Sequence, residues 1–297
     1  MLDWAAILTQ FPPWEGSAEP ESYRDFLGVR TRIRYYPPAY RSLAGTVQGM
    51  PGPDRAGLHD VAEWAGVLQS VLEAERQFVC VELGAGYGPF VVGSAIAARR
   101  RGITDIRLIA VEGSRARAEW ILEHMRDNGI DPDQHTITRG VIGTFDGFAH
   151  FPILDDNPIK SDAEPNFAAA SQENMERVPS YTIGTVLKDL KFVNIVHFDV
   201  QGGEADVIRN SLSILTEKCR RMVIGTHSLA IEDDLRSMLS HNGWAIEADE
   251  ACKLSPEGWL AHDGVQVWRN DRLSSAYPDK PQARTFSGLL RRIFAGS

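Results

Sequence analysis

From about residue 57 onward, short apolar runs alternate regularly with segments in which apolar residues recur at helical spacing. Short runs dominated by apolar residues predict buried strands at 78–83, 106–113, 136–143, 193–198 and 221–228. Between these runs apolar residues recur every three or four positions, which predicts helices such as those at 61–72 and 88–101. Because strand and helix alternate, the pattern predicts an α/β fold: a doubly wound, mostly parallel sheet with helices on both faces.

The two ends of the chain and one internal segment lack this regularity. Residues 1–55 contain several prolines with aromatic and arginine residues between them, which indicates an extension that packs on the core. We expect a core domain over 56–270, ending in two strands, WAIEAD and GVQVW, that pair as an antiparallel hairpin. Residues 152–180 are polar without a period, so they are expected to form a functional lid or a disordered insertion. A polar tail over 271–297 ends in a short basic amphipathic stretch.

Composition excludes some classes of protein and sets a default location. The 297 residues carry a formal net charge of -9, which argues against a general nucleic-acid binder. Neither a disulfide framework nor a structural zinc site is favoured, because the three cysteines are far apart and form no CxxC pair. No basic leader or bilayer-length apolar run is seen, so a cytoplasmic location without a transmembrane segment is expected. We also predict no metal, since no tight pair of aspartates occurs.

A glycine-rich loop, VELGAGYGPF, follows the first predicted strand. Gly84, Gly86 and Gly88 let the backbone turn tightly and lie close to a ligand. The spacing is GxGxG, whereas the dinucleotide fingerprint GxGxxG requires a small residue where this chain has Pro89. The carboxylate of Glu82 suits a cationic amino-acid ligand better than a pyrophosphate. The loop by itself could also be a tight strand-to-helix turn without a ligand.

An acidic residue, Glu112 in IAVEG, ends the second predicted strand. A carboxylate at this place can accept hydrogen bonds from both ribose hydroxyls of an adenosine. The alternative is a helix cap, but Ser114 could supply that cap. Together, the glycine loop and Glu112 predict an adenosyl cofactor without choosing between NAD and S-adenosylmethionine.

A third motif, HFDVQGGE at 197–204, follows the predicted strand at 193–198. With VELGAGYGPF and VEG, it resembles the FkbM-type S-adenosylmethionine-dependent methyltransferases over about residues 56–250. That family commonly reads KIDVEGAE here, so Gln201 replaces a glutamate and puts any metal or base role at that position in doubt. The resemblance implies a class I methyltransferase fold, S-adenosylmethionine as cofactor, and O-methylation of a sugar, glycan or secondary metabolite.

The same motif carries the candidate catalytic residues. The resemblance places Asp199 beside the methyl donor, and a charge at the end of a buried strand is costly unless paired or functional. Glu204 opens the next helix, where a carboxylate also complements the helix dipole, so a structural role is equally supported. A hydroxyl acceptor must lose its proton. His227 is the candidate base because an unperturbed histidine titrates near neutral pH, and His197, which shares a strand face with Asp199, is a second candidate. Both histidines could instead be packed residues.

These motifs lead to one set of expected cofactor contacts and partners. The contacts are expected from Glu82, Gly84, Ala85, Gly86, Gly88, Glu112, Gly113, Val141 and Asp199. The expected partner is a small-molecule or glycan acceptor, and a homo-oligomer is compatible with the sequence. Residues 30–41, RTRIRYYPPAYR, could grip an acidic acceptor, although packing of the arginines against the acidic core is favoured. A nicotinamide-dependent oxidoreductase and a non-catalytic binding module are the alternatives.

Overall fold

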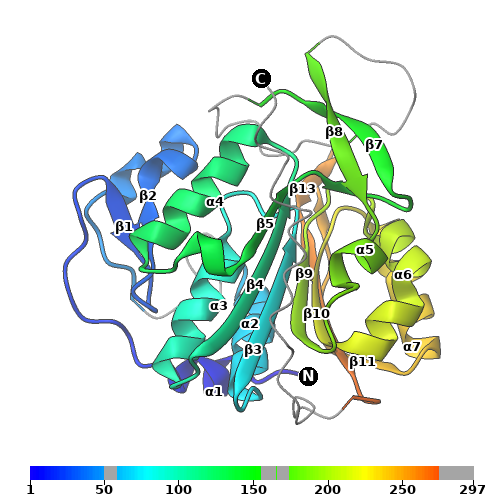
Figure 1. Ribbon diagram of the computed structural model, residues 1–297, viewed down its shortest axis with the longest axis horizontal. Coiled ribbons are helices and arrows are strands. Elements are labelled where there is room, and N and C mark those ends of the chain that lie inside the picture. The colour runs from blue at the N-terminus through cyan, green and yellow to red at the C-terminus, as the bar shows by residue number, and fades with distance from the viewer. Residues whose placement is uncertain (50–58, 155–164, 166–173, 274–297) are drawn as a thin grey trace.

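The main sheet of the protein has strand order β11-β14-β10-β9-β3-β4-β5 in the computed structural model, which describes residues 1–49, 59–154, 165 and 174–273 (Figure 1). The parallel strands are β3 (Gln77–Leu83), β4 (Asp105–Glu112), β5 (Thr136–Arg139), β9 (Val193–Phe198) and β10 (Cys219–Thr226). Chain order reverses between β3 and β9, which is where doubly wound sheets form their ligand crevice. The predicted α/β fold is confirmed.

The last strand of the described residues lies inside the main sheet and not at its edge. β14 (Gly264–Asn270) lies between β10 and β11 (Trp244–Glu250) and is antiparallel to both. The two predicted hairpin strands therefore pair, but a second small hairpin, β12 (Lys253–Leu254) and β13 (Leu260–His262), lies between them in the chain.

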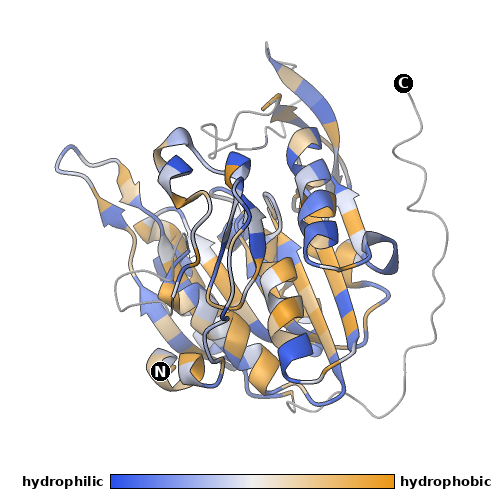
Figure 2. Ribbon diagram, turned by 90° about the vertical axis from the view of Figure 1, so that its left-hand side faces the viewer, coloured by the Kyte–Doolittle hydropathy of each residue, from blue (hydrophilic) through white to orange (hydrophobic). Residues whose placement is uncertain are grey.

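Helices cover both faces of the sheet because each presents one apolar stripe to it. One buried cluster joins the sheet to α1 (Trp4–Thr9), α2 (Val61–Leu72), α3 (Pro89–Arg100) and α4 (Arg115–Asp127). The other joins it to α5 (Ile183–Leu187), α6 (Glu204–Lys218) and α7 (Leu229–His241). Figure 2 shows hydrophobic colouring along the interior strands and hydrophilic colouring on the outer faces of helices. None of the helices in the described ranges has the length and apolar character needed to cross a membrane.

A small separate sheet differs from the sequence prediction. The predicted strand at 136–143 divides at Gly140, where an added Cβ would lie 2.8 Å from the Pro179 carbonyl oxygen. Its second half, β6 (Val141–Ile142), joins β8 (Met175–Tyr181) and β7 (Gly147–Pro152) in a three-stranded sheet (Figure 1). The end of the expected insertion 152–180 is thus a regular strand, while 155–164 and 166–173 lie outside the described residues.

The N-terminal segment packs on the face that carries α3 and α4. It contains β1 (Ser22–Arg24), β2 (Arg30–Arg32) and the 3-10 helices η1 (Ile33–Tyr35) and η2 (Pro38–Leu43); a further 3-10 helix, η3 (Pro132–Gln134), precedes β5. Arg32 and Arg34 pair with Asp127 and Glu123 of α4, so these arginines bind the core, as the packing interpretation predicts. Residues 50–58 and the tail 274–297 lie outside the described part of the chain.

Candidate functional site

The candidate site lies where the carboxyl ends of β3, β4, β9 and β10 meet. The Asp199 amide donates to the Leu83 carbonyl at 2.9 Å, which joins the ends of β9 and β3. Gly84 follows directly, and a Cβ added there would lie 1.8 Å from the Asp199 carbonyl oxygen. Gly84 also has φ +75°, a conformation that L side chains rarely adopt. Glycine is therefore required here, and its close approach brings the glycine loop against Asp199.

Glu112 is attached to the glycine loop by its own side chain. Its carboxylate accepts from the Gly86 amide at 2.8 Å and from the Ser114 amide at 2.7 Å. Only 4% of the residue is exposed, and this burial raises the pKa of the carboxyl above its usual value. Ser114 caps α4, as the sequence suggested. The second and first motifs are thus in direct contact, while the ribose-binding role of Glu112 stays a prediction.

Glu82 lies near the end of β3, just ahead of the glycine loop, and caps the helix that follows this loop. It is 1% exposed, and its carboxylate accepts from the Val91 amide at 2.7 Å and the Phe90 amide at 3.3 Å. These amides open α3, whose N-cap Gly88 has no side chain to satisfy them. Burial raises the pKa of Glu82 to about 7. Its observed role is to cap the helix that follows the loop, and its expected contact with the cofactor stays a prediction.

Asp199, Glu204 and His227 form a charged group beside the loop. His227 Nε2 lies 3.3 Å from the Asp199 carboxylate, and Nδ1 lies 2.9 Å from Glu204. Neither contact has hydrogen-bond geometry, so we treat both as ion pairs. Glu204 is fully buried and also accepts from the Val200 and Gly202 amides. Glu204 therefore shapes the turn after β9 and places a charge against His227.

The charges around His227 change the role expected for it. Burial disfavours the imidazolium, but the Asp199 and Glu204 carboxylates outweigh it and raise the pKa of His227 to about 10. His227 is then protonated at neutral pH, so the near-neutral pKa on which its assignment as a base rested does not hold. Burial of Asp199 acts to raise its pKa, but His227 outweighs this and lowers it. The Asp199 side chain, 43% exposed, thus presents a carboxylate to a ligand.

His197, the second candidate base, is buried between its own strand β9 and the helices α2 and α3. Its side chain is 3% exposed, its Nε2 is 3.1 Å from Glu63 of α2, and its ring stacks on Phe90 of α3 at 4.0 Å. Burial acts to lower the pKa of His197, and Glu63 more than offsets this and raises it. These contacts favour the packed interpretation. Glu63 was missed, although the spacing of Asp60 and Glu63 is that of a capping box, which the structure contains.

The remaining expected contacts lie on or beside the glycine loop and the small sheet. Ala85 is in the loop, where its amide donates to the Val111 carbonyl. Val141 is buried in the small apolar cluster of β6, β7 and β8. A Cβ added to Gly113 would lie 2.9 Å from the Phe151 ring of β7. The small sheet thus reaches the end of β4 beside Glu112. This contact could not be predicted from the sequence, because β7 shows only a weak alternation of apolar and polar residues.

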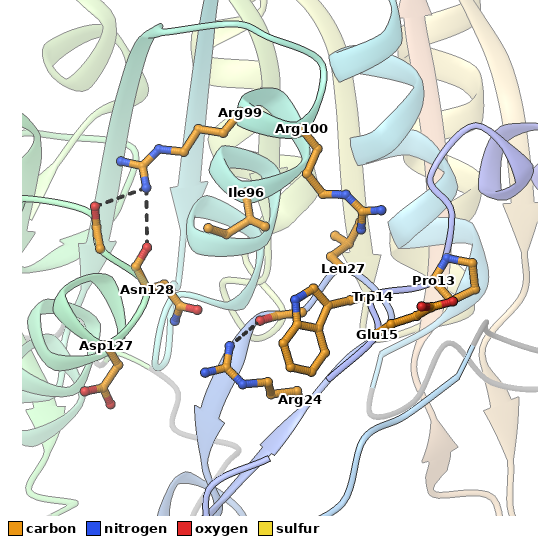
Figure 3. Close-up of a pocket in the computed structure, with 12 residues that line it drawn as sticks. Pro13, Trp14, Glu15, Arg24, Leu27, Ile96, Arg99, Arg100, Asp127 and Asn128 are labelled. Carbon is orange, nitrogen blue, oxygen red and sulfur yellow. Dashed lines mark hydrogen bonds between the residues drawn. The ribbon is translucent and has the colours of Figure 1, made fainter. Parts of the chain in front are cut away.

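A pocket of about 760 Å³ lies between the N-terminal segment and the C-terminal ends of α3 and α4 (Figure 3). It is lined by Trp14 and Arg24 of the N-terminal segment and by Arg99 and Arg100 at the end of α3. Arg99 donates to the Asn128 and Gly129 carbonyls, and Arg24 and Arg100 also bind backbone carbonyls. These guanidinium groups therefore hold the N-terminal segment and the loop after α4 in place.

Comparison with known proteins identifies the family. The chain is 33% identical over 245 residues to the "Putative methyltransferase" of Jannaschia sp. (strain CCS1), which covers 80% of this chain and 87% of that protein. The chain belongs to this methyltransferase family. No protein-family model matches the methyltransferase, so its resemblance to the FkbM type stays a prediction.

Several solved structures are distantly similar to this methyltransferase. The precorrin-6Y C5,15-methyltransferase of Geobacter metallireducens GS-15 has a TM-score of 0.41 at 11% identity, covering 70% of this chain and 86% of that chain. The O-methyltransferase of Bacillus cereus in complex with S-adenosylhomocysteine also has a TM-score of 0.41, at 8% identity, covering 74% and 84%.

Proposed function

We propose that this protein is an S-adenosylmethionine-dependent O-methyltransferase that acts on a hydroxyl of a sugar, glycan or secondary metabolite. One observation carries the proposal: Gly84 touches the Asp199 backbone while the Glu112 carboxylate binds the Gly86 amide. Three motifs far apart in the sequence therefore meet at the switch point of a doubly wound sheet. Membership of a methyltransferase family favours this function over the nicotinamide alternative.

The loop fits an adenosyl cofactor on structural grounds. Gly86 has φ +54°, and no atom lies within 4 Å of a Cβ added there, so its backbone faces open space. A ligand could therefore approach this backbone closely, and Glu112 is already held beside it. When bound, S-adenosylmethionine would supply an electrophilic methyl group. We assign Gly84, Gly86 and Gly88 to the close approach and Glu112 to the ribose.

Asp199 is the residue that we assign to the acceptor. Methyl transfer is an in-line displacement, so the acceptor oxygen must be held in line with the methyl–sulfur bond that breaks. The ionised Asp199 carboxylate can accept a hydrogen bond from the acceptor hydroxyl and take its proton as the new oxygen–carbon bond forms. Protonated His227 keeps this carboxylate in place and ionised. Its role in this proposal is to position Asp199.

Calorimetric titration with S-adenosylhomocysteine tests the cofactor assignment. We expect micromolar binding. Glu112→Ala should weaken it by about 1–3 kcal/mol, because the buried groups that hydrogen-bond to the carboxylate are left without a partner. Glu119→Ala, on the exposed face of α4, is the matched control and should bind like the wild type. Binding of NAD in place of S-adenosylhomocysteine would instead support the oxidoreductase alternative. No binding of either compound would favour the non-catalytic one.

A further inference from the structure

We propose that Tyr87 is a positioning residue, through which the N-terminal segment holds the glycine loop in its cofactor-binding shape. This inference rests on the proposed function. Tyr87 stands between Gly86 and Gly88, and both glycines have positive φ. A loop of this composition loses much conformational freedom when it is ordered, so it needs contacts that hold it. The Tyr87 side chain and carbonyl provide such contacts on two sides.

The first contact is a chain of hydrogen-bonded side chains that are buried or partly buried. The Tyr87 hydroxyl bonds to His59 Nε2 at 2.8 Å and to the Tyr36 hydroxyl. The Tyr36 hydroxyl in turn bonds to that of Tyr23 at 2.9 Å. Tyr23 and Tyr36 belong to the N-terminal segment, so this chain connects the segment to the glycine loop.

The hydroxyl chain is neutral at physiological pH. Burial raises the pKa of Tyr36 and of Tyr87 well above the usual value, and it lowers the pKa of His59. Each tyrosine hydroxyl therefore keeps its proton, and the His59 ring keeps one nitrogen as an acceptor. Removing the Tyr87 hydroxyl would leave the buried groups on both sides of it without that partner.

The second contact is made by the carbonyl of Tyr87. His124 of α4 places Nδ1 3.1 Å from this carbonyl oxygen and Nε2 3.1 Å from the hydroxyl of Thr31 in β2. Burial lowers the pKa of His124 to about 4, so the ring is neutral. A carbonyl oxygen can only accept, so Nδ1 carries the proton and Nε2 accepts from Thr31.

Aromatic rings complete the attachment. Tyr35 stacks on Tyr87 with centroids 5.5 Å apart and on Trp120 of α4 at 5.1 Å. Figure 1 shows β1 and β2 beside α4. The N-terminal segment thus contacts the loop from the side of α4, whereas Gly86 faces open space. The tyrosine contacts therefore leave the space next to Gly86 unfilled.

Conservative variants separate positioning from stability. Tyr87→Phe removes the hydroxyl and keeps the ring, and Tyr40→Phe is the control, because Tyr40 meets Tyr36 only by ring contact. We expect Tyr87→Phe to weaken binding of S-adenosylhomocysteine about tenfold, which is the scale of one lost buried hydrogen bond. Tyr40→Phe should bind like the wild type. In turnover assays Tyr87→Phe should raise KM for S-adenosylmethionine and leave kcat unchanged, because the acceptor groups are untouched.

A second set of variants distinguishes a loss of positioning from a general loss of stability. Thr31→Val removes the hydroxyl on the carbonyl side, and we expect it to weaken binding about threefold or more, since His124 loses a partner. Tyr23→Phe lies farther along the chain and should lower the melting temperature with less effect on affinity. Equal losses of melting temperature in Tyr23→Phe and Tyr87→Phe, with unchanged affinity in both, would overturn the positioning role.

Failure of the two proposals gives different results. If the wild type does not bind S-adenosylhomocysteine, the proposed function fails. If the wild type binds, and both Tyr87→Phe and Thr31→Val bind with the affinity of the wild type, the proposed function stands and the inference about Tyr87 is wrong. Should Tyr87→Phe not fold, as judged by circular dichroism, Thr31→Val decides the question by itself.

Discussion

Asp199 and His227 lie 3.3 Å apart at the carboxyl ends of two neighbouring parallel strands. The pairing depends on the fold, because 28 positions separate the residues in the sequence. It fixes the charge of both groups, since each favours the ionised form of the other. Glu204 adds a second carboxylate on the other side of the imidazole. The ion pairs of His227 thus help to stabilise the turn after β9.

The His227 pair should make stability depend on pH. The pKa of His227 is about 10 in the folded protein and near 6.5 in the unfolded chain, so its stabilisation is full below pH 6.5 and is lost as pH rises toward 10. We expect His227→Asn to lower the free energy of unfolding by roughly 2 kcal/mol at pH 6, less than for a fully buried pair. Urea unfolding of both proteins at pH 6, 8 and 9.5 should show this difference shrinking. A constant difference would contradict the assigned charge.

Asp199→Asn should reduce turnover far more than stability. The amide keeps the size of the side chain and loses the charge that we assign to the acceptor hydroxyl. We expect kcat to fall by about a hundredfold or more, the scale of general base catalysis. Asp234→Asn, which removes an exposed partner of Arg209, is the control and should keep full activity. The measurement is the initial rate on the first acceptor found; wild-type turnover by Asp199→Asn would refute the assignment.

Two glycines of the same loop should respond differently to alanine. A Cβ at Gly84 would overlap the Asp199 carbonyl, so Gly84→Ala should destabilise by about 4 kcal/mol or more. Gly86→Ala meets open space and carries only the strain of its positive φ, about 1–2 kcal/mol. Thermal unfolding measures both losses. Gly86→Ala should still fold and yet bind S-adenosylhomocysteine poorly. Similar stability of the two variants would show that Gly84 is not in close contact.

A buried ion network around Arg221, near the start of β10, should contribute strongly to stability. Arg221 of β10 is fully buried and pairs with Glu247 at 2.7 Å and with Glu73 at 2.9 Å. Arg221→Met would take away the buried cation that bridges both carboxylates and leave them only the more exposed Arg269 and Arg220, so we expect a loss of about 3–5 kcal/mol. Arg209→Met, which breaks two exposed pairs, should cost less than about 1 kcal/mol. Chemical denaturation of both variants tests this contrast.

Much of the fold could be predicted because buried parallel strands have a strong local signal. The strand at 193–198 coincides with β9, and the one at 78–83 differs from β3 by one residue. The division at Gly140 could not be read from apolarity, since the run continues through Val141 into another sheet. β14 was recognised as a strand, but its insertion next to β10 depends on pairing between distant segments.

The candidate site was predictable residue by residue, but not as a set of contacts. Glycines and carboxylates at strand ends identify Gly84, Glu112 and Asp199, because the crossover rules bring such ends to one edge. The raised pKa of His227 depends on two carboxylates that tertiary structure places beside it, so the pKa shift could not be predicted from the sequence. The contact between Tyr87 and the N-terminal segment likewise depends on how that segment folds back.

The position of β14 has a consequence for how the protein is made. Because β14 lies between β10 and β11, a nascent chain that has not yet reached Asn270 cannot pair either strand on that side. The strands around the glycine loop need no residue beyond Thr226, so they can assemble earlier during synthesis. Until β14 arrives, β10 would present an open edge of the kind that associates with other chains. On the ribosome, this half of the sheet is the part that would depend on chaperones.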